Sequence, residues 1–169
     1  STNLTTESDG NSYATDTSVL TSVLSGGTAE LDAVAVGDLQ SAYDYFLDSE
    51  TVDINLIVGV DGGADAVTLA NYLIGIAESR KDAVAFVSPA VSDTVNALSP
   101  ADNVKAFADQ VTSSSYGVID STALYVYDKF NDTFRYIVAA GTVAGLCAYT
   151  DDVADPWFSP AGCNRGQLR

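Results

Sequence analysis

Histidine is absent from the 169 residues of this chain, and lysine and arginine are scarce. Without histidine the chain lacks the commonest general base, the Ser/His/Asp and Cys/His nucleophile systems and the usual histidine-containing zinc sites. Seven cations stand against 23 carboxylates, which gives a formal net charge of −16. Because proteins bind the nucleic-acid backbone through cationic side chains, this balance argues against a nucleic-acid partner.

The few cations are also unevenly placed. All seven lie at or after Arg80, so residues 1–79 carry 13 carboxylates and no cation. One interpretation is a solvated, self-repelling surface that keeps the protein soluble. The other is an acidic region that meets a basic region of another copy. The charge pattern alone leaves both open.

Cysteines are few, and long apolar runs are missing. The spacing of Cys147 and Cys163 suggests neither a disulfide framework nor a metal cluster, so we interpret both as reduced thiols of a protein made inside the cell. No apolar run reaches the roughly 18 residues of a membrane-spanning helix, and the chain opens on a polar stretch rather than a signal peptide. Since the chain begins with Ser1 and stops abruptly at Arg169, we expect a piece of a longer protein.

The apolar content that is present, 47%, is sufficient for a folded core, and the length suits one main domain. Residues 1–28 are dominated by Ser, Thr, Gly and Asn. We predict a polar connector, or the end of a preceding domain, over residues 1–28. An α/β domain is predicted over residues 29–169.

Helical and strand patterns alternate along this domain. Helices are predicted from an N-cap at Asp38 to Leu47, over Asp65–Arg80, after Ser99 and over Ala140–Tyr149, and strands over Val52–Val60, Ala83–Val87, Tyr116–Asp128 and Phe134–Val138. The last two strands read as a hairpin. The alternation predicts an α/β layered fold with a mostly parallel sheet flanked by helices and an antiparallel hairpin near the C-terminal end. In the last helix, Gly141 and Gly145 are expected to allow close backbone approach.

The turn Gly59–Ala64 (GVDGGA) lies between a predicted strand and a predicted helix. Glycines at such a place can let the backbone approach a pyrophosphate at the helix N-terminus. The spacing is not G-x-G-x-x-G, however, and Asp61 and Asp65 would face the phosphates. A tight turn explains the glycines without a ligand. An α/β nucleotide-binding enzyme that uses this turn stays an alternative function.

Two further groups of residues have ordinary explanations. Asp151, Asp152 and Asp155 carry oxygen ligands suited to a hard cation, but they lack the spacing and central glycine of a calcium loop, so we predict no metal site. Five aromatic residues are predicted to pack within the hairpin rather than to stack on bases: Tyr125, Tyr127, Phe130, Phe134 and Tyr136. No nucleophile with a base is identifiable, so no catalytic residue is predicted.

The C-terminal stretch 155–166 (DPWFSPAGCNRG) places the only tryptophan, Trp157, between two prolines. One interpretation is a rigid, Trp-anchored loop that plugs the domain. The other is a shaped loop that presents Arg165 to a neighbouring subunit, since Trp and Arg are favoured anchors of buried interfaces.

This stretch resembles the tail sheath proteins of contractile-tailed bacteriophages, most closely those of the large-myovirus type. The most specific block is PWFSPAGCNRGQL at residues 156–168. Weaker phrases follow the same order as in that family: DINLI at 53–57, AESRKDAVAFVSP at 77–89, YDKFND at 127–132, VAG at 143–145 and TDD at 150–152. The resemblance covers residues 26–169.

The resemblance implies a structural subunit rather than an enzyme. Sheath subunits stack as six-membered rings around a tail tube and, on a baseplate trigger, slide and rotate into a shorter, wider state that drives the tube through the host envelope. The implied partners are therefore other sheath subunits, the tail tube protein and the baseplate, without cofactor, nucleic acid or membrane insertion. The implied location is the virion, after assembly in the host cytoplasm. We expect four residues at inter-subunit contacts: Asp151, Asp152, Trp157 and Arg165.

The chain departs from a whole sheath subunit. Family members continue after Asn-Arg-Gly into a C-terminal domain, and they have an N-terminal arm and often an inserted outer domain, none of which is evident here. We therefore expect the isolated chain to be a monomer that cannot form tubes. The sheath of a non-phage contractile injection system stays a second alternative, because it shares the mechanism.

Overall fold

The computed structural model describes residues 4–6, 12–14, 34–155, 157–162 and 166, and the chain divides into two compact units, Ser1–Ala33 and Val34–Arg169. In the first unit, β1 (Leu4–Thr6) and β2 (Ser12–Ala14) pair antiparallel, a strand pair that the polar composition did not indicate. The domain boundary predicted after residue 28 falls outside the described residues and stays a prediction.

Three parallel strands form the central sheet of the second unit, in the order β3–β4–β5. They are β3 (Leu56–Val58), β4 (Val84–Val87) and β5 (Gly117–Ile119). β3 is much shorter than the predicted strand Val52–Val60. The reason is that the carbonyls of Val52 and Ile54 accept hydrogen bonds from the side chain of Arg80 instead of pairing with a strand.

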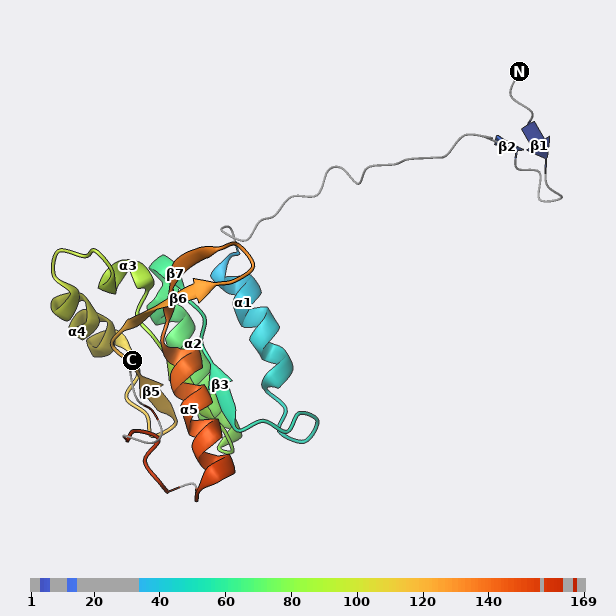
Figure 1. Ribbon diagram of the computed structural model, residues 1–169. Coiled ribbons are helices and arrows are strands. Elements are labelled where there is room, and N and C mark those ends of the chain that lie inside the picture. The colour runs from blue at the N-terminus through green and yellow to red at the C-terminus, as the bar shows by residue number, and fades with distance from the viewer. Residues whose placement is uncertain (1–3, 7–11, 15–33, 156, 163–165, 167–169) are drawn as a thin grey trace. The chain divides into compact units, whose positions relative to one another are not determined.

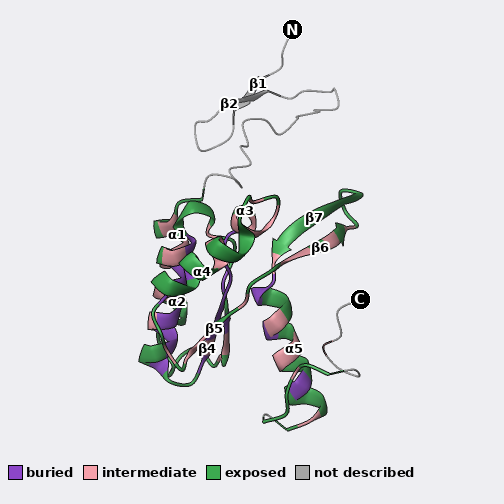
Figure 2. Cartoon of the chain, turned by 90° about the vertical axis from the view of Figure 1, so that its left-hand side faces the viewer, coloured by how far each residue is buried: buried purple, intermediate pink, exposed green. Residues whose placement is uncertain are grey.

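Helices cover both faces of this sheet (Figure 1). α2 (Ala66–Arg80), preceded by the 3-10 turn η2 (Gly63–Asp65), connects β3 to β4, and α3 (Val91–Thr94) and α4 (Pro100–Gln110) connect β4 to β5. α5 (Ala140–Val153) packs on β3 and β4 from the opposite face. Figure 2 shows α1 (Val36–Tyr43) and α2 on one side of the buried strands and α5 on the other.

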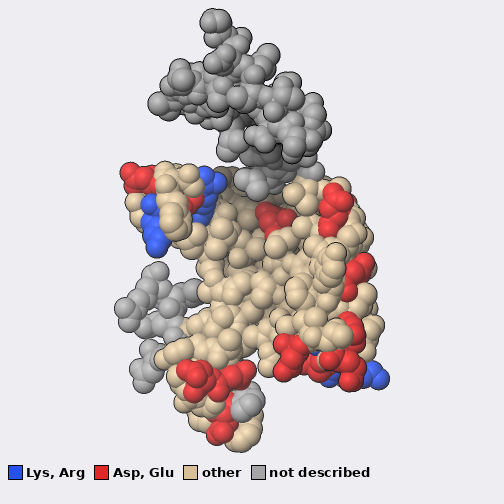
Figure 3. Space-filling view, turned by 90° about the vertical axis from the view of Figure 1, so that its right-hand side faces the viewer, with Lys and Arg blue, Asp and Glu red and all other residues tan. Residues whose placement is uncertain are grey.

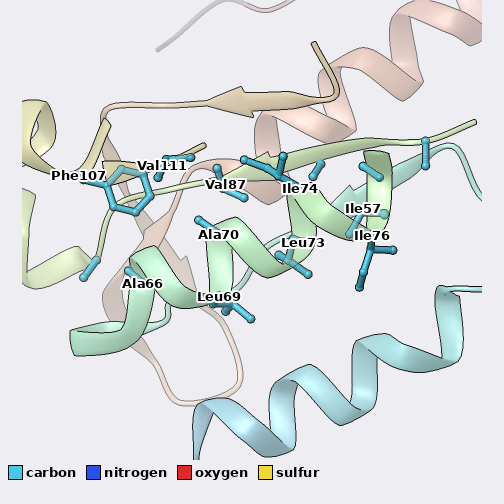
Figure 4. Packing of buried hydrophobic residues seen from close by; sticks show 14 residues of the cluster. Ile57, Ala66, Leu69, Ala70, Leu73, Ile74, Ile76, Val87, Phe107 and Val111 are labelled. Carbon is cyan, nitrogen blue, oxygen red and sulfur yellow. The ribbon is translucent and has the colours of Figure 1, made fainter. Parts of the chain in front are cut away.

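Alternation along the strands divides the core between these two faces. Ile57 and Val87 belong to the larger cluster on the α2 side, where Leu73 is fully buried (Figure 4). Phe86 points the other way and packs with Ala140 and Ala144 of α5. The helix predicted over Asp65–Arg80 and the predicted class, a parallel sheet flanked by helices with an antiparallel hairpin, are confirmed.

The start of α1 differs from the prediction. Ala35 occupies the N-cap position, so Asp38 lies in the first turn, where its carboxylate still suits the positive end of the helix dipole. After Tyr43 the chain tightens into the 3-10 turn η1 (Asp44–Phe46). The Tyr43 hydroxyl donates to the carbonyl of Val58 at 2.7 Å and ties α1 to the end of β3.

The segment Tyr116–Asp128, predicted as one strand, is two strands in different sheets. Its first part is β5, which pairs with β4, and its second part is β6 (Ala123–Asp128), which pairs antiparallel with β7 (Thr133–Val138). The break lies at Asp120, whose N–H donates to the carbonyl of Val87 at 3.2 Å and whose Oδ1 accepts from the N–H of Thr122 at 3.4 Å.

α5 extends to Val153, four residues beyond its predicted end, so Asp151 and Asp152 lie in its last turn. A Cβ added at Gly141 would lie 3.7 Å from Val58, an ordinary contact, and one added at Gly145 would meet no atom within 4 Å. The close backbone approach predicted at these two glycines is therefore wrong as far as the described residues go.

Candidate interaction surface

The β6–β7 hairpin carries a face of exposed rings, here called the aromatic face: Tyr125, Tyr127, Phe134 and Tyr136. Tyr125 lies opposite Tyr136 and Tyr127 opposite Phe134, with ring centroids 4.6 and 5.1 Å apart, and a diagonal stack of 5.1 Å joins Tyr125 to Phe134. The predicted packing within the hairpin is confirmed for these four rings but not for Phe130, which contacts none of them. Each ring nevertheless stays between 48% and 59% exposed, so the face is also open to a partner.

The turn of the hairpin is held by its own side chains. Asp128 accepts hydrogen bonds from the N–H groups of Phe130 and Asn131, at 3.0 and 3.3 Å, and its Oδ2 lies 3.2 Å from Nε of Arg135. The hydrogen bond from the Asn131 side chain, with these partners, holds the pKa of Asp128 below its usual range. The turn is therefore ordered without a ligand, although Phe130 at its tip is 87% exposed.

A second bond fixes one ring of the aromatic face. The Tyr127 hydroxyl donates to Oδ1 of Asp132 at 2.6 Å, and this hydrogen bond raises the pKa of Tyr127. Asp132 adopts a left-handed backbone conformation, φ 50°, as the turn requires. The Lys129 ammonium lies 5.0 Å from the centre of the Phe130 ring, so the tip presents an aromatic side chain together with a cation.

A buried hydrogen-bond network joins the hairpin to the sheet. Ser88, 5% exposed, follows β4, accepts a hydrogen bond from the N–H of Ala140 at 3.0 Å and donates to the carboxylate of Asp120. Burial raises the pKa of Asp120. The network ties the first residue of α5, and with it the end of β7, to the ends of β4 and β5. The Ser88 oxygen thus holds a helix and does not face a substrate cavity.

Three of the four predicted contact residues lie at or just beyond the other end of α5. Asp151 and Asp152 are exposed in its last turn. Trp157 is 80% exposed, so the interpretation of a plug anchored by this residue is wrong. Arg165 lies outside the described residues. We define the α5-end surface as Tyr149, Val153 and Trp157, three exposed apolar side chains, together with Asp151 and Asp152.

The geometry of the Gly59–Ala64 turn argues against a nucleotide site. A Cβ at Gly59 would lie 2.9 Å from the carbonyl oxygen of Phe86, and Gly63 has φ +52°, so strand packing and the turn explain both glycines. Asp61 already accepts the N–H of Gly63 at 3.0 Å, where a phosphate would meet a negative charge. Gly59 and Val60 line two cavities, one of about 10 Å³, room for about one water, and one of about 300 Å³. The larger one is also lined by Asp61, whose carboxylate would repel a phosphate there.

Other kinds of site find little support in the described part of the chain. No three or more His, Cys, Asp or Glu side chains there are arranged to hold a metal ion, and Asp151, Asp152 and Asp155 form no such group. Cys147 is a free thiol whose pKa is raised by burial, and Cys163 lies outside the described residues. None of the described helices combines the length and the hydrophobicity that crossing a membrane would demand.

Sequence reasoning missed that the aromatic face is a surface. The signal was present, since Tyr125 and Tyr127 alternate on β6 and Phe134 and Tyr136 on β7. Val126 and Arg135 share the other face. The described residues thus combine a buried α/β core with two exposed apolar surfaces. Exposed apolar surfaces of this kind are typical of proteins that contact other proteins.

Comparison with known proteins shows which proteins this chain is similar to. The chain is 36% identical over 160 residues to the tail sheath protein of Enterobacteria phage T4, a match that covers 86% of the chain. It is 36% identical over 164 residues to the tail sheath protein of Vibrio phage KVP40, a match that covers 85% of the chain. It is 43% identical over 98 residues to the tail sheath protein of Salmonella phage ViI, a match that covers 56% of the chain. The resemblance to tail sheath proteins is confirmed over most of the sequence.

The chain spans about a quarter of the length of the first two curated relatives, 24% of each, and 15% of the third. No protein-family model matches the chain.

Proposed function

We propose that this chain is a structural segment of a tail sheath subunit of a contractile-tailed phage. The observation that carries the proposal is the similarity to tail sheath proteins of three phages, which extends over most of the chain in two of them. The partners are other sheath subunits, the tail tube and the baseplate. The segment acts mechanically rather than as an enzyme, and it works in the virion after assembly in the host cytoplasm.

Contraction drives the tube through the host envelope by exchanging contacts between subunits that keep their fold. Such a transition requires a rigid unit and surfaces with two alternative arrangements. The core between α2 and the sheet supplies rigidity, since Leu73 and Ile74 are almost completely buried. The exposed surfaces at the hairpin and at the end of α5 supply exchangeable contacts. In this proposal Asp151, Asp152, Trp157 and Arg165 lie at contacts between subunits.

Electron microscopy tests the proposal directly. The complete open reading frame that contains this sequence is expressed alone and imaged in negative stain. Striated tubes of contracted-sheath type are expected, whereas dispersed globular particles at high concentration would overturn the proposal. The 169-residue chain alone is expected to sediment as a monomer.

The contact residues are tested in the same tubes. Reversing Asp151 to Lys or Arg165 to Glu is expected to reduce tube yield, because each change replaces an attractive contact by a repulsive one. Glu78→Lys, at an exposed position in the last turn of α2 on the opposite side of the sheet from α5, is the matched control. Normal tubes from both reversals would exclude these residues from the contacts.

A further inference from the structure

Both covalent connections between the hairpin and the rest of the domain lie at the same end of the hairpin. Ala123 at the start of β6 lies opposite Val138 at the end of β7, so the two strands leave from neighbouring points. Residues 120–122 connect β5 to β6, and the single residue Ala139 connects β7 to α5. Figure 2 shows the paired strands projecting from the sheet, with their turn away from it. The hairpin is therefore an arm with a single base.

The side chains of the hairpin interact mainly with one another. Each described hydrogen bond, ion pair and ring contact made by a side chain of residues 123–138 has both partners within the hairpin. β7 also packs on the short helix α3. Figure 3 shows basic and acidic side chains together at the hairpin, apart from the other charged groups on that face. The arm therefore keeps its own polar and aromatic contacts if its direction changes.

A buried network fixes the base of the arm to the sheet. Ser88, directly after β4, donates a hydrogen bond to the carboxylate of Asp120 and accepts one from the N–H of Ala140 at 3.0 Å. Asp120 begins the connection to β6, and Ala140 directly follows the connection from β7. We call Ser88, Asp120 and the N–H of Ala140 the latch. One hydroxyl group thus holds both connections of the arm.

The latch contains a carboxylate that water would stabilise. Burial raises the pKa of Asp120, and none of the described cations forms an ion pair with this residue. Burying a carboxylate without a cation is unfavourable, so opening the latch returns charge to water and offsets part of the cost of its two hydrogen bonds. The latch is therefore suited to opening, unlike the buried guanidinium of Arg80, which is paired with the carboxylate of Asp82.

Space next to the base leaves room for the arm to turn. A cavity of about 300 Å³ lies between the end of β7 and the end of β3, and its lining includes Ile137 and Val60. A second cavity of about 530 Å³ lies beside the other connection, and its lining includes Thr122 and Pro100 at the start of α4. Because protein interiors are close-packed, cavities beside both connections leave this joint less constrained than the core. Turning the arm toward either cavity changes its direction without changing its internal pairing.

We propose that the hairpin is a hinged arm, which turns as a unit about residues 120–122 and Ala139 when the latch opens. Hinges of this kind are a few residues at the ends of elements that absorb the change in backbone angles. The α/β core keeps its fold during this movement, and only the direction of the aromatic face changes. The inference goes beyond the proposed function, because the arm and the latch belong to this chain by itself.

Double electron–electron resonance between two spin labels measures the direction of the arm. The 169-residue chain carries Cys147→Ala and Cys163→Ser, with one label at Phe130→Cys on the exposed tip and the other at Glu78→Cys on α2. Strands of six residues make the arm about 20 Å long, so a turn of about 20° moves its tip by about 7 Å. Ser88→Ala is expected to broaden the distance distribution by about this amount, whereas the intact latch gives one narrow distribution.

The control pair, Glu78→Cys with Lys105→Cys on exposed α4, lies within the core and is expected to keep its distribution in every variant. Asp120→Ala is the second test of the latch and should broaden the tip distribution as Ser88→Ala does, and circular dichroism checks that each variant is folded. Unchanged tip distributions in both folded variants would overturn the hinge, and a broad distribution with the intact latch would overturn the latch. Equal broadening of the control pair would show that the whole fold loosens, which would also overturn the hinged arm.

Discussion

Arg80 organises more of the backbone than any other single side chain among the described residues. Its side chain is completely buried, and its guanidinium donates to the carbonyls of Phe46 at 2.7 Å, Val52 at 2.8 Å and Ile54 at 3.4 Å. It also forms two bonds of 2.9 Å to Asp82. The sequence predicted only that a helix ends at Arg80, because carbonyl partners 26 to 34 residues earlier cannot be seen in a local pattern.

Replacing Arg80 by Lys is expected to lower the free energy of unfolding by about 2–3 kcal/mol. A lysine has three donors on one nitrogen and cannot reproduce the planar fork, so buried carbonyls lose their partners. Urea unfolding followed by circular dichroism measures the change. Lys105→Met, at an exposed site, is the control and should shift stability by less than about 0.5 kcal/mol. An Arg80→Lys variant as stable as the control would contradict the role of the fork.

Asp120 and Asp48 are expected to affect stability with opposite pH dependence. Burial raises the folded-state pKa of Asp120 above 3.8, so its contribution is fully present below that pH and is lost as pH rises through the folded pKa. Hydrogen bonds, first from the N–H of Glu50, lower the pKa of Asp48, so its contribution is present above pH 3.8 and lost as pH falls.

Urea unfolding of the wild type, Asp120→Asn and Asp48→Asn over a pH series checks these signs. The stability of the wild type relative to Asp120→Asn should decrease with rising pH, and relative to Asp48→Asn it should increase. Two slopes of the same sign would be incompatible with the opposite environments of the two carboxyl groups.

At the scale of elements, the cross-strand rings are expected to stabilise the hairpin. A double-mutant cycle of Tyr125→Ala and Tyr136→Ala should give a coupling energy of about 0.5–1.5 kcal/mol, as expected for an aromatic pair. Thermal unfolding of the four proteins measures it. A matched cycle of Tyr136→Ala with Tyr45→Ala, an 80% exposed tyrosine on η1, should give no coupling. Equal coupling in both cycles would show that the rings act through general destabilisation.

Elements defined by local periodicity were predictable, and elements defined by distant partners were not. α2 and the hairpin follow from apolar spacing and a turn-prone Asn131-Asp132 within their own segments. The break at Asp120 depends on Val87 and Ser88 at the end of β4, more than 30 residues earlier. The shortening of β3 depends in the same way on Arg80.

Of the two candidate surfaces, the sequence pointed to residues of the α5-end surface but not to the aromatic face. Asp151, Asp152 and Trp157 were identified from a resemblance, and the structure brings them to one end of α5 without testing their role. The aromatic face was predicted as internal packing, because alternation cannot tell a ring pair that faces a core from one that faces solvent. Distinguishing them requires the exposure of the folded rings, each of which is about half exposed.

At the scale of the whole molecule, the net charge of −16 sets a general condition for folding and association. Like charges repel in the compact state more than in the unfolded chain, so the excess of carboxylates destabilises the fold. Salt reduces this repulsion, because the Debye length falls from about 30 Å at 0.01 M to about 8 Å at 0.15 M.

The chain is therefore expected to unfold at a higher temperature in 0.15 M than in 0.01 M sodium chloride, as measured by scanning calorimetry. The control is a variant in which four exposed carboxylates without a hydrogen bond or ion pair in the described residues become amides: Asp38, Asp53, Asp65 and Asp151. This variant carries four fewer negative charges, so its unfolding temperature should depend less on the salt concentration. Its buried core is unchanged. A salt dependence that is unchanged in this variant would mean that specific ion binding, rather than overall repulsion, governs the stability of the chain.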